Sequence, residues 1–253
     1  DMNSDSFNQH PVGTGRYKFI SWDKAGGIIN FAKNGDYYAK VPKIAKLAYQ
    51  TVATESTKAL MLEKGEADLA WLNAKYADRF RGNSKFQNYD FITADYRSVK
   101  MNFQTDFWKK NRDSIGVLNH AVDKDAIVKS VLANQGKTAY SPIQLNPFGG
   151  NKEADLYRYD PEKFTREMEK LGWKKGGDGI YERNGQKFQF SIQVRDYEEE
   201  RVDIANIVSK QLKQAGVVMK IVLVTKFDWK AGYNGFLAGY ASEFDPDALY
   251  QQL

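Results

Sequence analysis

The chain has 253 residues, 42% of them hydrophobic and 14% aromatic, so it can bury one large core or two small ones. Lys and Arg outnumber Asp and Glu by 37 to 32, but both signs are mixed along the chain, which argues against nucleic-acid binding. The chain has no Cys and only two His. This composition excludes disulfides and thiolate metal sites, and it leaves little material for a His-rich metal site or a Ser-His-Asp triad.

The first hundred residues predict a strand, helix, strand order, which is typical of an α/β domain. A helix is predicted from Thr54, a suitable N-cap, to about Lys64, with Gly65 ending it. Asn34, Gly35 and the following Asp supply turn chemistry between two strands. Alternation and apolar runs predict strands at 16–21, 26–32, 46–52, 66–72 and 86–93.

The second part of the chain predicts a further α/β arrangement. Asp123 and Asp160 read as N-caps, and the second is followed by proline at the first helical position. The nearly continuous apolar run 217–224 predicts a strand buried on both faces. The helices are predicted at 112–121, 124–132, 161–171 and 198–215, and the strands at 99–103, 180–183, 187–194, 217–224 and 235–239.

A set of polar and aromatic side chains follows the last predicted strand. Tyr240 and Phe244 supply rings, and Glu243 and Asp245 supply carboxylates. Rings can stack on or cover a ligand, and a carboxylate can pair with an ammonium group or another cation. The alternative interpretation is a simple turn, in which Asp245 and the next proline break the chain and the rings belong to the core.

Six stretches of the sequence, in this order, match one protein family. The chain resembles the extracytoplasmic solute-binding proteins of peptide and nickel ABC transporters, and the resemblance runs through essentially its whole length. The matching stretches are Gly13–Phe19 (GTGRYKF), Glu63–Trp71 (EKGEADLAW), Ala121–Val128 (AVDKDAIV), Tyr159–Gly172 (YDPEKFTREMEKLG), Gln211–Val218 (QLKQAGVV) and Leu237–Pro246 (LAGYASEFDP).

The resemblance implies an α/β fold of the two-lobed, type II periplasmic-binding-protein kind, with the ligand held between the lobes. Residues 1–97 would be the later part of lobe one, which is incomplete, and residues 98–253 most of lobe two. Such a protein is expected to be a monomer without a cofactor or catalytic activity. It would work outside the cytoplasm, in the periplasm or as a lipoprotein at the cell surface, and deliver its solute to a membrane permease.

The resemblance also assigns candidate ligand contacts. The family's turn commonly reads Gly-Trp-Gly-Ala-Asp-Tyr-Pro-Asp-Pro, and here it is one residue shorter, with Tyr240 at the Trp position. Glu243 stands where peptide-binding members place the Asp that pairs with the peptide's terminal ammonium. Phe244 replaces Tyr, and Asp245 reads mainly as a turn former. Arg97, in the expected crossing segment between the lobes, can reach a ligand carboxylate; the alternative is a solvated arginine.

Two functions fit this family. The first is binding of a peptide, and the alternative is binding of nickel or a metal chelate, for which Tyr240 and Phe244 would also serve as aromatic walls. Asp247 stands where some nickel binders have His, which counts against nickel. Two further classes are a hydrolase, for which no nucleophile and base pair is visible, and an interaction domain that binds no small molecule.

Overall fold

The structure is a computed structural model that describes residues 5–93, 95–141 and 156–241. The chain forms two compact units, Asp1–Leu72 and Asn73–Leu253. Among the described residues, no helix is both long enough and apolar enough to cross a membrane.

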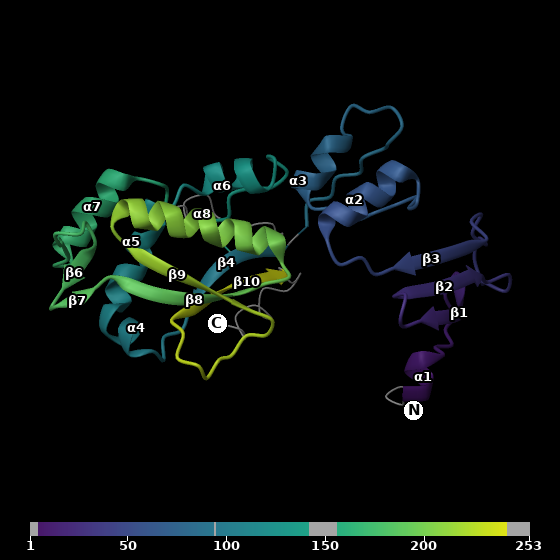
Figure 1. The fold of residues 1–253 in the computed structure, drawn as a ribbon, viewed down its shortest axis with the longest axis horizontal. Coiled ribbons are helices and arrows are strands. Elements are labelled where there is room, and N and C mark those ends of the chain that lie inside the picture. The colour runs from purple at the N-terminus through teal and green to yellow at the C-terminus, as the bar shows by residue number, and fades with distance from the viewer. Residues whose placement is uncertain (1–4, 94, 142–155, 242–253) are drawn as a thin grey trace. The chain divides into compact units, whose positions relative to one another are not determined.

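The first unit contains a three-stranded antiparallel sheet in the order β1-β2-β3 (Figure 1). The predicted helix is present as α2, where Thr54 Oγ1 accepts from the backbone N–H of Thr57 at 3.1 Å and Gly65 takes a left-handed conformation with φ 73°. The three predicted strands at 16–21, 26–32 and 46–52 are therefore confirmed, as is the helix. The elements are α1 (Asp5–Gln9), β1 (Tyr17–Asp23), β2 (Ile28–Lys33), β3 (Lys46–Gln50) and α2 (Glu55–Lys64).

The first unit has almost no closed core. The rings of Phe19, Phe31 and Tyr49 make edge contacts along the sheet, with centroids 6.2 and 5.8 Å apart. Tyr49 is nevertheless 64% exposed, and Ala59 is the one apolar side chain of this unit that is fully buried among the described residues. Packing of an apolar face supplies most of the stability of a small sheet, so this unit has little stability of its own.

Two predicted strands are wrong. Residues 66–72 and 86–93 contain neither a strand nor a regular helix. In the first of them Leu69 is 83% exposed and Trp71 is 71% exposed, so the apolar run does not form the buried strand that its composition suggested.

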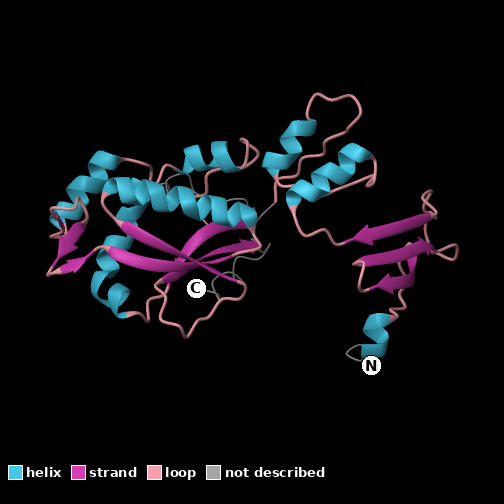
Figure 2. Cartoon of the chain, in the orientation of Figure 1, coloured by secondary structure: helices cyan, strands magenta, loops and turns pink. Residues whose placement is uncertain are grey.

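The second unit is built on a four-stranded sheet in the order β4-β10-β8-β9. The strands β8 and β9 are parallel and are joined by the long helix α8, which packs against both of them (Figure 2). The strand β10 runs parallel to β8, and β4 pairs antiparallel with β10 at the other edge. These elements are β4 (Asp95–Met101), β8 (Gln189–Arg195), α8 (Glu199–Ala215), β9 (Val218–Val224) and β10 (Gly235–Ala241).

Shorter elements surround this sheet. Asp123 and Asp160 cap α6 and α7 through side-chain bonds of 2.9 and 2.8 Å, as predicted. The predicted helix 112–121 is instead a succession of short turns, η2, α5 and η3. The remaining elements are α3 (Ala74–Ala77), η1 (Asp78–Phe80), α4 (Asp106–Asn111), η2 (Arg112–Ser114), α5 (Ile115–Leu118), η3 (Asn119–Ala121), α6 (Lys124–Val131), α7 (Pro161–Lys170), β5 (Lys174–Lys175), β6 (Tyr181–Arg183) and β7 (Gln186–Lys187).

The core of the chain lies in the second unit, where Trp108, Trp173 and Phe188 are fully buried and their rings are in contact. The strand β9 is an edge strand, so the prediction that it is buried on both faces is wrong; Lys220 and Leu223 are exposed. An apolar strand sequence therefore did not distinguish a central position from an edge.

The lobe boundary at residue 97 stays a prediction. The two compact units separate at Leu72 and Asn73, whereas residue 97 lies within β4, which is part of the second unit's sheet. The predicted strand 99–103 accordingly begins earlier, at Asp95.

Candidate functional site

The candidate site lies where the parallel strands β8 and β10 end and α8 begins. In an α/β sheet, ligands bind outside the carboxyl ends of the parallel strands, because side chains and helix starts converge there. Arg195 is the last residue of β8, and Glu199 is the first residue of α8. The antiparallel neighbour β4 starts at the same end of β10, since Asp95 is paired with Ala241.

Arg97 is held at this end of the sheet by two carboxylates. Its Nη1 lies 2.5 Å from Asp95 Oδ2, and its Nε lies 3.4 Å from Glu200 Oε1. The first partner is on its own strand and the second is in the first turn of α8. Arg97 therefore links the edge strand to the start of the helix, and its side chain is 28% exposed.

Two further arginines share one carboxylate. Arg195 Nη1 lies 3.6 Å from Glu198 Oε1, and Arg201 Nη1 forms an ion pair with Glu198 Oε2. Burial lowers the pKa of Arg201; the negative charge of Glu198 opposes that effect, and the positive charge of Arg97 adds to it. Positive charges thus gather at this point, and each is offset by a nearby carboxylate.

Gly239 of β10 makes room for this cluster. It is the register partner of Arg97 on the neighbouring strand. A Cβ atom at this position would lie 2.5 Å from Arg97 Nη1 and 2.7 Å from Arg201 Nη2. The two guanidinium groups therefore lie directly against the backbone of β10, one residue before Tyr240.

The cluster contains a buried N–H group that the described residues leave unsatisfied. Arg195 Nε has no hydrogen-bond partner among them, whereas Arg97 Nε lies 3.4 Å from Glu200 Oε1 and Glu198 Oε2 forms its ion pair with Arg201. An unsatisfied buried polar group costs about 1–3 kcal/mol, so such groups are rare and each calls for an explanation. A polar ligand is one such explanation.

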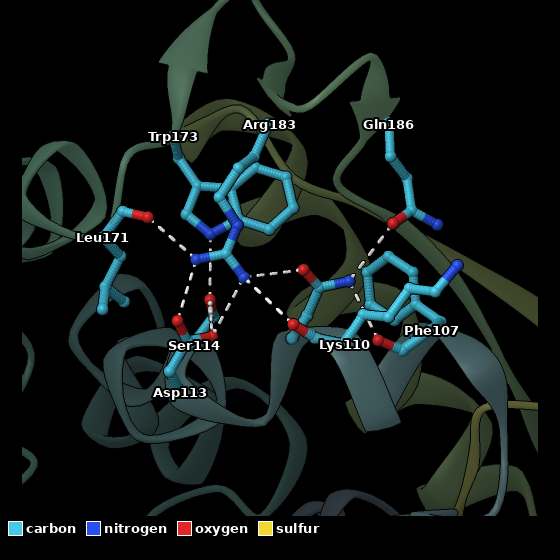
Figure 3. A network of polar contacts seen from close by, with 9 residues as sticks. Phe107, Lys110, Asp113, Ser114, Leu171, Trp173, Arg183 and Gln186 are labelled. Atoms are coloured by element: carbon cyan, nitrogen blue, oxygen red, sulfur yellow. Dashed lines mark hydrogen bonds and ion pairs between the residues drawn. The ribbon is translucent and has the colours of Figure 1, made fainter.

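Arg183 belongs to another polar network, in which its guanidinium group is hydrogen-bonded to several protein groups (Figure 3). Its Nη1 donates to Asp113 Oδ2 and to the Leu171 carbonyl, both at 2.8 Å, and its Nη2 donates to Asn111 Oδ1 at 2.8 Å. Its guanidinium also lies 4.7 Å from the Trp173 ring centroid. Because several protein partners surround it, Arg183 joins structural elements and is not a candidate ligand contact.

An aromatic pocket lies beside the arginine cluster, on the segment that joins β9 to β10. The Trp229 ring is 4.3 Å from the Phe236 ring, and Phe227 is 5.2 Å from Phe236. The Arg195 guanidinium lies 4.9 Å from the Phe227 ring centroid, which connects the pocket with the cluster. The pocket is shallow, with an enclosed volume of about 10 Å³, which is room for about one water molecule. Its lining is completed by Asn102, Gln193, Asp228, Tyr233 and Gly235.

The structure describes only some of the predicted ligand contacts. Arg97 is in the cluster, and the backbone of Tyr240 is paired with Tyr96 in the β10–β4 ladder. The side chain of Tyr240 lies outside the described part of the chain, as do Glu243 and Phe244.

Asp245 also lies outside the described residues. Sequence reasoning missed Arg195, Glu198 and Arg201. The signal that could have found them is their position at the end of a predicted strand and the start of the next predicted helix. Among the described residues, no three His, Asp or Glu side chains come together as a metal site.

The family of the chain is shown by comparison with known proteins. The whole chain, residues 1–253, matches the family described as bacterial extracellular solute-binding proteins, family 5 Middle. The chain therefore belongs to the family 5 solute-binding proteins, as its sequence motifs indicated.

Individual relatives agree with this family. The oligopeptide-binding protein AppA of Bacillus subtilis is 29% identical over 91% of this chain and 42% of AppA. The crystal structure of NikZ from Campylobacter jejuni in complex with Ni(L-His) matches with a TM-score of 0.82 and 32% identity, over 97% of this chain and 50% of the NikZ chain. The structure of B. subtilis AppA in complex with a nonapeptide has a TM-score of 0.72 at 24% identity, over 95% of this chain and 49% of that chain.

Two conclusions follow from these matches. The chain has the mixed α/β architecture of two-lobed family 5 proteins and spans about half of their length, which fits an incomplete first lobe. The matches include a protein named for oligopeptide binding, AppA, and a protein crystallised with Ni(L-His), NikZ, so there is a relative for each of the two interpretations.

Proposed function

We propose that this chain is part of the substrate-binding component of an ABC importer, which binds a peptide between two lobes and delivers it to the membrane permease. The observation that carries the proposal is the cluster of Arg97, Arg195 and Arg201 at the carboxyl ends of β8 and β10, in which the buried Arg195 Nε has no hydrogen-bond partner among the described residues. A guanidinium fork matches a carboxylate in shape and charge, and every peptide with a free C-terminus carries one.

In this proposal the cluster binds a carboxylate of the peptide, and the Trp229 ring packs on an apolar side chain next to it. Trp229 is 62% exposed, so its ring is available to cover such a side chain. Residues 1–97 and 98–253 belong to the two lobes, and the ligand is held by both. Binding closes the lobes because the closed form makes more contacts with the solute.

The residues after β10 complete the proposed site. Tyr240 and Phe244 form aromatic walls, Asp245 shapes the turn, and Glu243 pairs with the terminal ammonium of the peptide. Truncating one partner of a buried charge pair typically costs about 2–5 kcal/mol. We therefore expect Glu243→Gln in the full-length protein to weaken peptide binding about tenfold or more. Calorimetry tests this, and an unchanged affinity would remove Glu243 from the site.

The second candidate function is binding of nickel as a metal chelate. It is supported by the similarity to NikZ, whose structure contains Ni(L-His). A chelating amino acid also carries a carboxylate, so the arginine cluster is compatible with this cargo. Binding that EDTA abolishes would favour the chelate, and binding that survives EDTA would favour the peptide.

We further propose that the protein works outside the cytoplasm, in the periplasm or as a lipoprotein, and that it is a monomer without catalytic activity. The description of the family as extracellular solute-binding proteins supports this location. In the described part of the chain the arginines and carboxylates of the site pair with one another, and this arrangement suits binding more than proton transfer.

The proposal is tested by native mass spectrometry of the full-length protein purified from its source. We expect co-purified peptides that are released intact on denaturation. A protein without any small molecule would contradict the proposal, and a bound metal chelate would replace the peptide function with the nickel one. Cleavage of a released peptide during incubation would show a hydrolase.

A further inference from the structure

Glu198 occupies the position before the first turn of α8, but its side chain does not cap the helix. The helices α2, α6 and α7 are capped by side-chain bonds from Thr54, Asp123 and Asp160. Ser, Thr, Asp and Asn are preferred at this position because a short side chain reaches the free backbone N–H groups, which stabilises the helix. The longest helix of the chain thus begins without this stabilisation.

The Glu198 carboxylate is instead directed to two arginines. One of its oxygens pairs with Arg195 at 3.6 Å, and the other pairs with Arg201. The side chain is only 22% exposed, so these ion pairs are partly shielded from water. A residue that is unfavourable at its position in a helix, and gains no local contact in return, is expected to have a role in a functional site.

Both arginines are fixed in place around this carboxylate. The Arg195 guanidinium lies 4.9 Å from the Phe227 ring and 5.8 Å from the Tyr197 ring. The Arg201 guanidinium lies against the backbone at Gly239. With Glu198 as the third contact, neither guanidinium is free to turn away from the end of the sheet.

We propose that Glu198 is a positioning residue, which holds Arg195 and Arg201 in the orientation that receives a carboxylate of the solute. This inference rests on the proposed peptide function. It predicts that the length of the side chain matters as well as its charge, because the carboxylate has to lie between the two guanidinium groups and not on the helix.

The test is Glu198→Asp in the full-length protein. This variant keeps the charge, and its shorter carboxylate can accept from the backbone N–H of Glu200 or Arg201 as an ordinary cap. The matched control is Glu199→Asp, one residue later, because Glu199 accepts from Tyr76 at 2.8 Å and pairs with Lys75. Both variants shorten a glutamate in the same turn, and only the first moves a partner of Arg195 and Arg201.

Affinity is measured by calorimetry for a pool of nonapeptides of mixed sequence with free C-termini, and for the same pool with amidated C-termini. We expect Glu198→Asp to weaken binding of the free acids about tenfold and to change binding of the amides little, while the melting temperature stays the same or rises. Glu199→Asp should leave the ratio of the two affinities as in the wild type. A role confined to folding would not change this ratio.

A Glu198→Asp variant with the wild-type ratio would overturn the inference alone. A wild-type protein that binds acids and amides equally would overturn the inference and also the carboxylate-binding role of the arginine cluster in the proposed function. A wild-type protein that binds neither pool would contradict the proposed peptide function itself. The two failures are therefore distinguishable in one set of measurements.

Discussion

Gly239 connects the architecture of the sheet with the charge of the site. The space that a side chain would fill is taken by the ends of Arg97 and Arg201, which are flexible and can move. Gly235 in the same strand is different, because a Cβ there would lie 2.6 Å from the backbone carbonyl of Lys100. Substitution by Ala at Gly239 therefore tests the position of the arginine side chains, whereas substitution by Ala at Gly235 tests the packing of the backbone.

We expect Gly239→Ala to lower the free energy of unfolding by less than about 1 kcal/mol and to weaken binding of a free-acid peptide about tenfold, because the guanidinium groups are displaced. Gly235→Ala should instead lower stability by more than 1 kcal/mol, since backbone has to move (about 1–3 kcal/mol for overpacking). Urea denaturation and calorimetry on the full-length protein distinguish the two. Equal stability losses at both positions would contradict this assignment.

For Arg183 we predict the opposite: this residue is important for stability and not for binding. Its side chain is 14% exposed, and it bonds to Asp113, Asn111 and Leu171. Arg183→Met keeps an apolar contact with Trp173 but leaves these partners unsatisfied, so we expect a loss of about 2–4 kcal/mol. The control Lys187→Met removes an ion pair with Asp178 that is half exposed, and its effect should be smaller. A similar loss in both variants would refute the structural role.

The ion pair between Arg183 and Asp113 predicts that stability depends on pH. The hydrogen bond from Arg183 lowers the pKa of Asp113, with Ser114 contributing further. A lowered pKa stabilises the folded state above the unfolded-state value of about 4, and this contribution is lost as the pH falls through the folded-state pKa. The stability difference between wild type and Arg183→Met should therefore shrink when denaturation is repeated below about pH 4. A constant difference would exclude this coupling.

Helix starts are the elements that the sequence predicted best. Thr54, Asp123 and Asp160 act locally, through the backbone N–H groups two or three residues later, so no knowledge of the rest of the fold is needed. The turn at Asn184 and Gly185 is local in the same way, and both residues have positive φ angles, 53° and 73°.

The elements that the sequence predicted wrongly depend on distant partners. Residues 66–72 have the composition of a buried strand, but they form no strand, and Trp71 is exposed. The position of β9 at the sheet edge is set by topology, which an apolar run does not encode. The arginine cluster was only one-third predictable for a similar reason: Arg97, Arg195 and Arg201 come together through strand pairing across more than a hundred residues of sequence.

The caps also allow the two units to be probed separately. Asp160 caps α7, whose Phe164 and Met168 are buried in the core, so Asp160→Ala should lower the stability of the second unit by about 1 kcal/mol. Thr54→Ala removes the N-cap hydrogen bond of α2 in the first unit. This substitution should leave the unfolding transition of the second unit unchanged. Differential scanning calorimetry of the chain reports both. A shift of the main transition by Thr54→Ala would show that the units unfold together.

At the scale of the whole molecule, the buried core belongs to the second unit. All residues of the main hydrophobic cluster lie between Phe107 and Leu237, whereas the first unit buries only Ala59 among its described apolar side chains. We therefore expect residues 73–253 alone to unfold cooperatively and residues 1–72 alone to show no cooperative transition. Circular dichroism during thermal denaturation tests both fragments, and a cooperative transition in the shorter one would contradict the division.

The pairing of β4 with β10 has a consequence for the time at which the protein can fold. Residues 95–101 and 235–241 are adjacent in the sheet, but more than a hundred residues of sequence separate them, so the second strand leaves the ribosome long after the first. Closing so long a loop is slow, and the unfinished sheet exposes the edge of β8 until β10 arrives. During synthesis the second unit therefore remains incomplete until β10 has been made, and for that time it is open to proteins that bind unfolded polypeptide.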